Sequence, residues 1–186
     1  MSTRLIYVTG PSGAGKDSLL TWLKGQLPAH APTHWARRTI SRPVQAGGEA
    51  HEAVTVQAFD QLQVQGSFAL HWQANQMKYG IRQTELAPLN DGLWVLVNGS
   101  RGYLAQARER YPALTVLHVT ASADILRRRL LARGRETPEM VEARVQRATQ
   151  FPPAVGTGLI EIHNNGALDD AGAALLSALQ GLEGWA

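Results

Sequence analysis

Short apolar runs alternate with amphipathic stretches along most of the chain. Runs rich in branched and aromatic residues predict strands at 4–10, 93–99, 114–120 and 159–163. The second and third of these runs are nearly continuous, which is typical of parallel strands covered on both faces. Apolar residues at helical spacing predict helices at about 15–27, 101–110, 122–133, 137 onward and 168–182. Strands that alternate with helices indicate an α/β fold with a mainly parallel sheet.

The stretch from about 33 to 90 departs from this pattern. It holds shorter runs, "THWARRTIS" and "SFALHWQA", with glycines at 47, 48, 66 and 80. We therefore expect an insertion with strands of its own, packed beside the core. The 186 residues suit one domain, and the sequence contains no internal repeat or low-complexity segment.

The segment "YVTGPSGAGKDSLL" joins the first predicted strand to the first predicted helix. Gly10, Gly15 and Lys16 fit the phosphate-loop pattern G-x-x-x-x-G-K-[ST]. Backbone N–H groups in such a loop point inward, and the start of the helix adds positive partial charge, so anions bind there. The alternative is a glycine turn that binds nothing. The predicted nucleotide-binding residues of this loop are Gly10, Pro11, Ser12, Gly13, Ala14, Gly15, Lys16, Asp17 and Ser18.

Asp17 stands where the pattern has a hydroxyl residue, and the hydroxyl follows one place later at Ser18. A carboxylate is a hard oxygen ligand that suits Mg²⁺, so Asp17 is the candidate metal ligand. Alternatively, Asp17 is only an acidic residue in the first helical turn, favoured there by the helix dipole.

Arginine makes up most of the positive charge of the chain. Of 18 basic residues 15 are arginine, and seven of these lie between Arg127 and Arg147 beside three glutamates. The guanidinium group is a rigid fork suited to binding phosphate oxygens. A composition biased toward arginine, or a solvated basic face, is the alternative explanation.

The remaining composition excludes several classes of protein. There is no cysteine, so disulfides and thiolate metal sites are excluded, which fits a reducing cytoplasm. No apolar run approaches the roughly 18 residues of a membrane span. The first strand begins almost at once, which leaves no room for a signal peptide. We expect a soluble, cytoplasmic protein without a membrane partner.

The sequence resembles the guanylate kinases over nearly its whole length. "GPSGAGKDSLL" is followed by "SRP", "GGE", "YG", "RLLARGRE", "EARV" and "NNGAL" at matching places. The resemblance implies a P-loop kinase fold, α/β, with a mainly parallel five-stranded sheet flanked by helices, and it implies ATP and Mg²⁺. It divides the single domain into a core (1–32 and 91–186), an acceptor-binding insertion (about 33–90) and a helical lid (about 129–147).

The resemblance also implies roles for particular side chains. Lys16 and the lid residues Arg129, Arg133 and Arg144 match cations that neutralise the transferring phosphoryl group. Asn165, with Gly166, matches the loop that lies against adenine. Arg42 and Tyr79 match residues that hold the acceptor phosphate. Other cations in the insertion, Arg37, Arg38, Lys78 and Arg82, suit an acceptor with two phosphates. Glu49, His51 and Glu52 are candidates for ribose hydroxyls or metal, or are surface residues.

The departures from guanylate kinases fall at the positions that read the base. Leu70 replaces a glutamate, and the neutral Asn98-Gly99 replaces an aspartate. The segments "RRTISRP", "GGEAHEAV" and "NGSRGYL" resemble the ribose 1,5-bisphosphate phosphokinase branch of this fold. That resemblance implies transfer of the ATP γ-phosphoryl group to ribose 1,5-bisphosphate, giving 5-phosphoribosyl 1-diphosphate, in phosphonate breakdown.

Three alternatives stay open at this point. A true guanylate kinase would need the two missing carboxylates. A non-catalytic guanylate-kinase-like binding module would not need the retained Gly10, Gly15 and Lys16. Nucleic-acid binding would suit the arginine cluster, but 122–150 has no aromatic residue to stack on bases. We therefore expect small-molecule substrates and no nucleic-acid partner, while the sequence leaves the oligomeric state open.

Overall fold

The computed structural model describes residues 4–43, 50–134, 136–150 and 158–185. The chain divides into two compact units. The first combines the residues up to Tyr7 with Pro32–Leu114, and the second combines Val8–Ala31 with the residues from Thr115 onward. The predicted candidate Glu49 lies outside the described residues.

A five-stranded sheet has the order β2-β7-β1-β8-β9, in agreement with the predicted fold class. Its strands are β1 (Leu5–Thr9), β2 (Thr33–Ala36), β7 (Trp94–Asn98), β8 (Thr115–Thr120) and β9 (Leu159–His163). β2 pairs in parallel with β7, and β8 pairs in parallel with β9. Every residue of β1 and β7 is buried, which explains why their sequences are continuous apolar runs.

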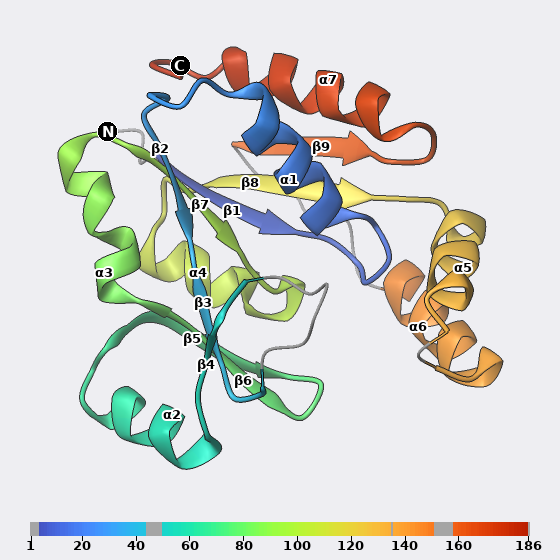
Figure 1. Ribbon diagram of the computed structural model, residues 1–186, viewed down its shortest axis with the longest axis horizontal. Helices are drawn as coiled ribbons and strands as arrows, with labels where there is room; N and C mark the ends of the chain where they lie inside the picture. The colour runs from blue at the N-terminus through green and yellow to red at the C-terminus, as the bar shows by residue number, and fades with distance from the viewer. Residues whose placement is uncertain (1–3, 44–49, 135, 151–157, 186) are drawn as a thin grey trace. The chain divides into compact units, whose positions relative to one another are not determined.

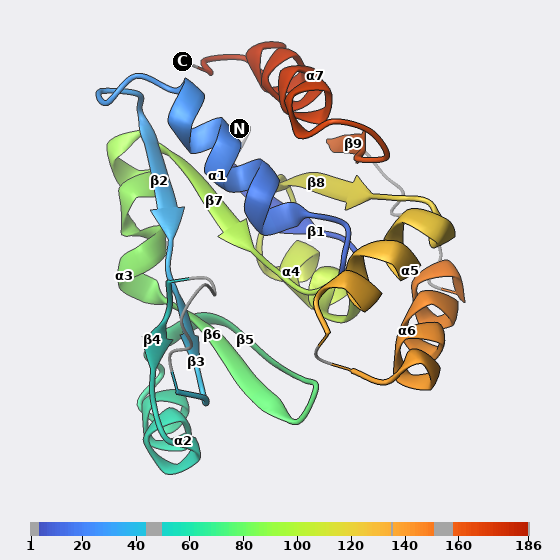
Figure 2. The ribbon, with the colours of Figure 1, turned by 45° about the vertical axis from the view of Figure 1, so that its right-hand side comes forward.

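Among its described residues, the second unit carries four helices beside β8 and β9. They are α1 (Lys16–Gln26), α5 (Ala123–Ala132), α6 (Pro138–Gln150) and α7 (Leu168–Gln180). α1 and α7 lie side by side, and so do α5 and α6 (Figures 1 and 2). Leu19 and Leu23 of α1 and Leu175 and Leu179 of α7 are buried, so these two helices supply much of this unit's core. Their boundaries agree with the predicted ones to within two residues.

The first unit contains a second sheet of four strands, with the order β4-β3-β6-β5. Its strands are β3 (Arg38–Ile40), β4 (Glu52–Ala53), β5 (Phe68–Ala74) and β6 (Met77–Arg82). β5 and β6 form an antiparallel hairpin, and the two residues of its turn, Asn75 and Gln76, both have positive φ. This is the turn geometry that matches the twist of paired strands. The strands expected within 33–90 are therefore present.

Short helices complete the first unit. They are α2 (Val56–Val64), α3 (Gln83–Leu86), α4 (Leu104–Arg110) and the 3₁₀ segments η1 (Ala87–Asp91) and η2 (Arg101–Tyr103). The predicted helix at 101–110 is thus a 3₁₀ turn followed by an α-helix. No helix in the described parts of the chain is long and apolar enough to cross a membrane.

One segment of the predicted insertion lies in the main sheet instead. Thr33–Ala36 forms β2 and pairs with β7, whereas β3 begins two residues later in the four-stranded sheet. All four residues of β2 are half-buried, because it is an edge strand. An edge strand needs no continuous apolar run, and this is why "THWA" resembles the insertion more than the core.

Candidate active site

The loop between β1 and α1 has the backbone conformation of a phosphate cradle. Gly10, Gly13 and Gly15 have φ of 151°, 89° and 86°. A Cβ atom on Gly10 would lie 2.0 Å from the Val119 carbonyl oxygen on β8, so no other residue fits there. The glycine spacing seen in the sequence therefore has a steric cause in this unit.

Lys16 is the first residue of α1, at the end of this cradle. Its Nζ donates to the carbonyl oxygens of Gly10 (2.9 Å) and Pro11 (3.2 Å). The ammonium group thus lies across the mouth of the loop, next to the partial positive charge of the helix start. Asp17 and Ser18 follow in the first turn, and both are exposed. This arrangement suits a polyphosphate with a cation beside it.

Arg129 of α5 reaches the same loop from the predicted lid. Its Nη1 donates to the Ala14 carbonyl oxygen and its Nη2 to Asn164 Oδ1, both at 3.4 Å. Burial, together with the neighbouring Arg128 and Arg133, lowers the pKa of Arg129 below the ordinary arginine value. An anion arriving beside it would relieve that cost, because it compensates a partly desolvated positive charge.

Arg144 of α6, also within the predicted lid, approaches the loop from a second helix. Its Nη1 donates to Ser12 Oγ at 3.1 Å, and its Nη2 pairs with Glu136 Oε1 at 3.0 Å. The Glu136 side chain is only 16% exposed, so this carboxylate is held beside the guanidinium. Sequence reasoning did not single out Glu136, since a glutamate among arginines resembles a surface residue.

Arg133, the third predicted lid arginine, is placed differently. It is the exposed C-cap residue of α5, one position beyond the last helical residue. In the described parts of the chain it makes no hydrogen bond to the loop, unlike Arg129 and Arg144. The structure therefore brings two of the three arginines to the loop.

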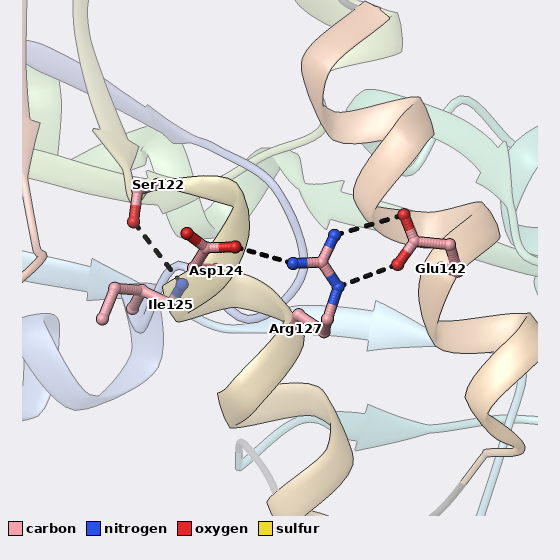
Figure 3. A network of polar contacts seen from close by, with 5 residues as sticks. All are labelled: Ser122, Asp124, Ile125, Arg127 and Glu142. Atoms are coloured by element: carbon pink, nitrogen blue, oxygen red, sulfur yellow. Dashed lines mark hydrogen bonds and ion pairs between the residues drawn. The ribbon is translucent and has the colours of Figure 1, made fainter.

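An ion-pair network ties α5 to α6 (Figure 3). Arg127 donates from Nε and Nη2 to the two carboxylate oxygens of Glu142 on α6, at 2.8 and 3.2 Å. Its Nη1 donates to Asp124 on its own helix at 2.7 Å. These hydrogen bonds raise the pKa of Arg127 and lower that of Glu142. The network therefore holds α5, which carries Arg129, and α6, which carries Arg144, together.

The two asparagines after β9 have different contacts. Asn165, the predicted adenine-side residue, is exposed, and its Oδ1 accepts from the Ser122 backbone N–H at 2.7 Å. Asn164 is 2% exposed and donates to the Ala14 carbonyl oxygen at 2.8 Å. Asn164 thus contacts the phosphate loop, a role that the sequence analysis did not assign to it, and the predicted adenine contact of Asn165 stays a prediction.

In the first unit, the predicted acceptor residues Arg38 and Tyr79 belong to one aromatic stack. The Arg38 guanidinium carbon lies 5.2 Å from the centre of the Tyr79 ring. Tyr79 stacks on Trp72 at 5.6 Å, and Trp72 stacks on Tyr103 at 5.7 Å. Trp72 and Tyr79 are directly opposite on β5 and β6, and both are 8% exposed. The stack therefore orients the guanidinium rather than offering an open platform.

Arg42 and His51 lie together at the end of the four-stranded sheet. His51 is 7% exposed, and its Nε2 donates to the Arg42 carbonyl oxygen at 3.4 Å. Arg42 Nε is buried and makes no hydrogen bond to the described residues. A buried guanidinium N–H without a partner is costly, so this atom is suited to an anionic ligand.

Two other cations of the insertion are engaged in ion pairs. Lys78 pairs with Asp60, and Arg82 binds both carboxylate oxygens of Glu52 at 3.0 and 2.7 Å. The hydrogen bond from Arg82 is the main cause that lowers the pKa of Glu52. Glu52, a candidate for ribose or metal, thus serves to neutralise Arg82 within the sheet. Among the described residues, no group of three His, Asp or Glu side chains is arranged to hold a metal ion.

The two predicted base-reading positions are neutral and covered. Leu70 is 0% exposed and pairs with the equally buried Ile81 across the hairpin. Asn98, the last residue of β7, is 8% exposed. A ligand that presents hydrogen-bond donors would find no carboxylate at either position.

Comparisons with known proteins place the chain among kinases. No family model matches the chain. It is 47% identical over 181 residues to ribose 1,5-bisphosphate phosphokinase PhnN of Pseudomonas paraeruginosa, covering 97% of both chains. It is 46% identical over 172 residues to the protein of the same name from Pseudomonas fluorescens, covering 90% of both.

A solved structure extends the comparison to the fold. Guanylate kinase from Anaplasma phagocytophilum superposes with a TM-score of 0.65 and 13% identity, covering 97% of this chain and 86% of that one. At this identity the likeness concerns the fold alone. The expected α/β kinase fold is therefore confirmed by a structural neighbour as well as by the strand order.

Proposed function

Because this chain belongs to the ribose 1,5-bisphosphate phosphokinase family, we propose that it phosphorylates ribose 1,5-bisphosphate with ATP. The observation that carries the proposal is the 47% identity over nearly the full length of a relative with that name. The γ-phosphorus–oxygen bond of ATP breaks, and a bond forms from that phosphorus to an oxygen of the 1-phosphate. ADP and 5-phosphoribosyl 1-diphosphate are the products. The reaction would belong to bacterial phosphonate breakdown in the cytoplasm.

The donor half of this proposal is supported by the loop of the second unit. Backbone N–H groups of the cradle and Lys16 would hold the β- and γ-phosphates. Arg129 and Arg144 contact the same loop, so they would neutralise charge on the transferring group. Arg133 would join them only if its side chain turned toward the phosphates.

The residues around the loop also fit a magnesium ion. Mg²⁺ in kinases is commonly held by one or two carboxylates, phosphate oxygens and waters, so no dedicated protein cage is needed. Asp17, exposed in the first turn of α1, would supply a carboxylate next to the phosphates, and Ser18 a hydroxyl. When bound, the ion would draw charge from the β- and γ-phosphate oxygens.

The acceptor half is supported by the first unit. Arg38 over the Tyr79 ring and Arg42 with its buried Nε are guanidinium groups suited to phosphate oxygens. An acceptor phosphate is already anionic near neutral pH, so it needs positioning rather than a strong general base. His51 and Glu49 would then serve in binding the sugar.

Acceptor choice follows from the neutral positions 70 and 98. Leu70 cannot accept hydrogen bonds from a guanine edge, and each such donor left buried and unpaired would cost about 1–3 kcal/mol. Two such losses predict a preference of roughly a hundredfold or more for a base-free acceptor over guanosine monophosphate.

The decisive experiment offers three acceptors to the purified protein with ATP and magnesium while ADP release is followed. Ribose 1,5-bisphosphate is expected to turn over. Ribose 5-phosphate lacks the accepting 1-phosphate and is expected to be nearly inert. Comparable or faster turnover of guanosine monophosphate would instead identify a guanylate kinase. No turnover, with or without retained ATP binding, would favour a non-catalytic binding module.

A further inference from the structure

Asn164 is a buried polar side chain that links the phosphate loop to the lid. It follows β9 directly, and its own backbone N–H donates to the Thr120 carbonyl oxygen at the end of β8, at 2.8 Å. Its Nδ2 donates to the Ala14 carbonyl oxygen at 2.8 Å, and its Oδ1 accepts from Arg129 Nη2 at 3.4 Å. The nitrogen and the oxygen of the side-chain amide therefore each have a hydrogen-bond partner. A side chain that is 2% exposed cannot exchange these partners for bulk water.

The contact with Ala14 sets the orientation of a peptide group in the loop. A trans peptide is planar, and its C=O and N–H point in opposite directions. Because the Ala14 carbonyl is held by Asn164, the N–H of Gly15 is directed to the opposite side of the chain. That side is away from Asn164 and Arg129, and an N–H presented there is what a phosphate cradle requires.

The hydrogen bond from Arg129 to Asn164 is longer and weaker than the one from Asn164 to Ala14, so it positions the guanidinium without fixing it. Both hydrogen bonds of this guanidinium, to Ala14 and to Asn164, measure 3.4 Å, which is longer than an ordinary N–H···O hydrogen bond. The carboxamide oxygen keeps the cation beside the loop without holding it as tightly as a carboxylate would. A phosphate can therefore take over the guanidinium at little cost.

We propose that Asn164 is a positioning residue of the donor site, which directs the Gly15 N–H toward ATP and keeps Arg129 beside the loop. The proposal rests on ATP as the donor in the proposed function, but it does not depend on the identity of the acceptor. Asn164 itself need not touch the nucleotide. Its two functions are carried by different atoms, Nδ2 and Oδ1, so they can be separated by substitution.

Two substitutions at this position separate the functions. Asn164→Asp keeps an oxygen for Arg129 but replaces the donor to Ala14 with a second acceptor, so the Gly15 N–H loses its orientation. Asn164→Ser is too short to reach both partners, and it removes both contacts. The readouts are the affinity for ATP by titration calorimetry, without any acceptor, and kcat with ATP and ribose 1,5-bisphosphate.

We expect Asn164→Asp to weaken ATP binding roughly tenfold or more, because the donor to Ala14 is lost, and also to lower kcat, because its carboxylate holds Arg129 more tightly than the amide does. Asn164→Ser should weaken ATP binding similarly and also lower kcat by about ten- to a hundredfold. In an Arg129→Ala background, Asn164→Ser should lower kcat no further, while it still weakens ATP binding. A residue with only a structural role would not produce this split.

Ile162→Ala is the matched control, because Ile162 is 5% exposed on β9, which Asn164 follows directly, and it contacts neither Ala14 nor Arg129. It should lower thermal stability, and its effect on kcat should be the same with and without Arg129. If folded Asn164→Asp and Asn164→Ser bind ATP as the wild type does, the proposal is wrong. If Asn164→Ser and Arg129→Ala lower kcat independently, the link to Arg129 is wrong. Should Asn164→Ser not fold, Asn164→Leu, which removes both contacts at a similar side-chain size and adds no charge, takes its place in both measurements.

The acceptor assay tests the proposed function, and the Asn164 variants test the inference, so the two can fail independently. Normal ATP binding by both Asn164 variants, with ribose 1,5-bisphosphate turned over, would overturn the inference and leave the proposed function intact. Weakened ATP binding by the Asn164 variants of a protein that does not use ribose 1,5-bisphosphate would overturn the proposed function and leave the inference about Asn164 intact.

Discussion

Replacing Gly15 with alanine tests the loop geometry most directly. Gly15 is the N-cap residue of α1, with φ 86° and ψ 22° in the left-handed region. A Cβ atom added there would lie 2.4 Å from Asn164 Nδ2, well inside the van der Waals distance. The substitution therefore strains the backbone and also pushes the Asn164 amide away from Ala14.

The two effects can be given magnitudes. A left-handed conformation costs alanine roughly 1–2 kcal/mol. If Asn164 shifts, its 2.8 Å hydrogen bond to Ala14 breaks, and a buried amide without a partner costs about 1–3 kcal/mol. Together we expect a loss of about 2–5 kcal/mol in the free energy of unfolding. That is a large fraction of the roughly 5–15 kcal/mol that stabilise a domain.

The measurement is urea unfolding at neutral pH, with the KM for ATP determined on the folded variant. Gly25→Ala is the matched control, because Gly25 lies inside α1 and a Cβ there meets nothing within 4 Å. Alanine at that position should raise the free energy of unfolding by about 0.5–1 kcal/mol and leave the KM for ATP unchanged.

Two results would contradict this reasoning. Equal stability of Gly15→Ala and the wild type would mean that the Gly15 conformation or its distance to Asn164 differs from the one described. A normal KM for ATP despite a large loss of stability would mean that the loop peptides after Ala14 do not bind the nucleotide.

Three further predictions concern charged groups. Lys16→Ala and Arg144→Ala should each lower kcat by about a hundredfold or more while the protein stays folded, and near-normal turnover of both would refute the phosphate-site assignment. Asp17→Asn should raise the magnesium concentration needed for half-maximal rate, and Asp17→Ser should restore much of the activity. An unaltered magnesium titration of Asp17→Asn would mean that Asp17 is only an acidic residue of the first helical turn. The hydrogen bond from Arg82 lowers the pKa of Glu52 below its ordinary 4.5, so the folded state binds that proton less tightly than the unfolded state. The stability that Glu52 adds over Glu52→Gln should therefore be complete above pH 4.5 and disappear as the pH falls below the lowered pKa, which urea unfolding across this range would test.

The sequence by itself determined the elements and the donor loop. Continuous apolar runs at β1, β7 and β8 are sufficient signals because all residues of β1 and β7 and most residues of β8 are buried. The glycine spacing identified the cradle because the positive φ values of Gly13 and Gly15 already disfavour other residues locally, although contacts with distant residues such as Val119 add to the exclusion. The helix start at Thr137 was equally local, since its Oγ1 accepts from the Met140 N–H three residues later.

Only the tertiary structure decided which polar side chains have which partners. Asn164 and Ala14 are 150 residues apart, so no local pattern distinguishes Asn164 from its neighbour Asn165. Arg82 seemed suited to a phosphate until the sheet paired it with Glu52. Charge and residue type are properties of the sequence, but neutralisation depends on which strands lie together, and strand order is set by packing across the whole fold.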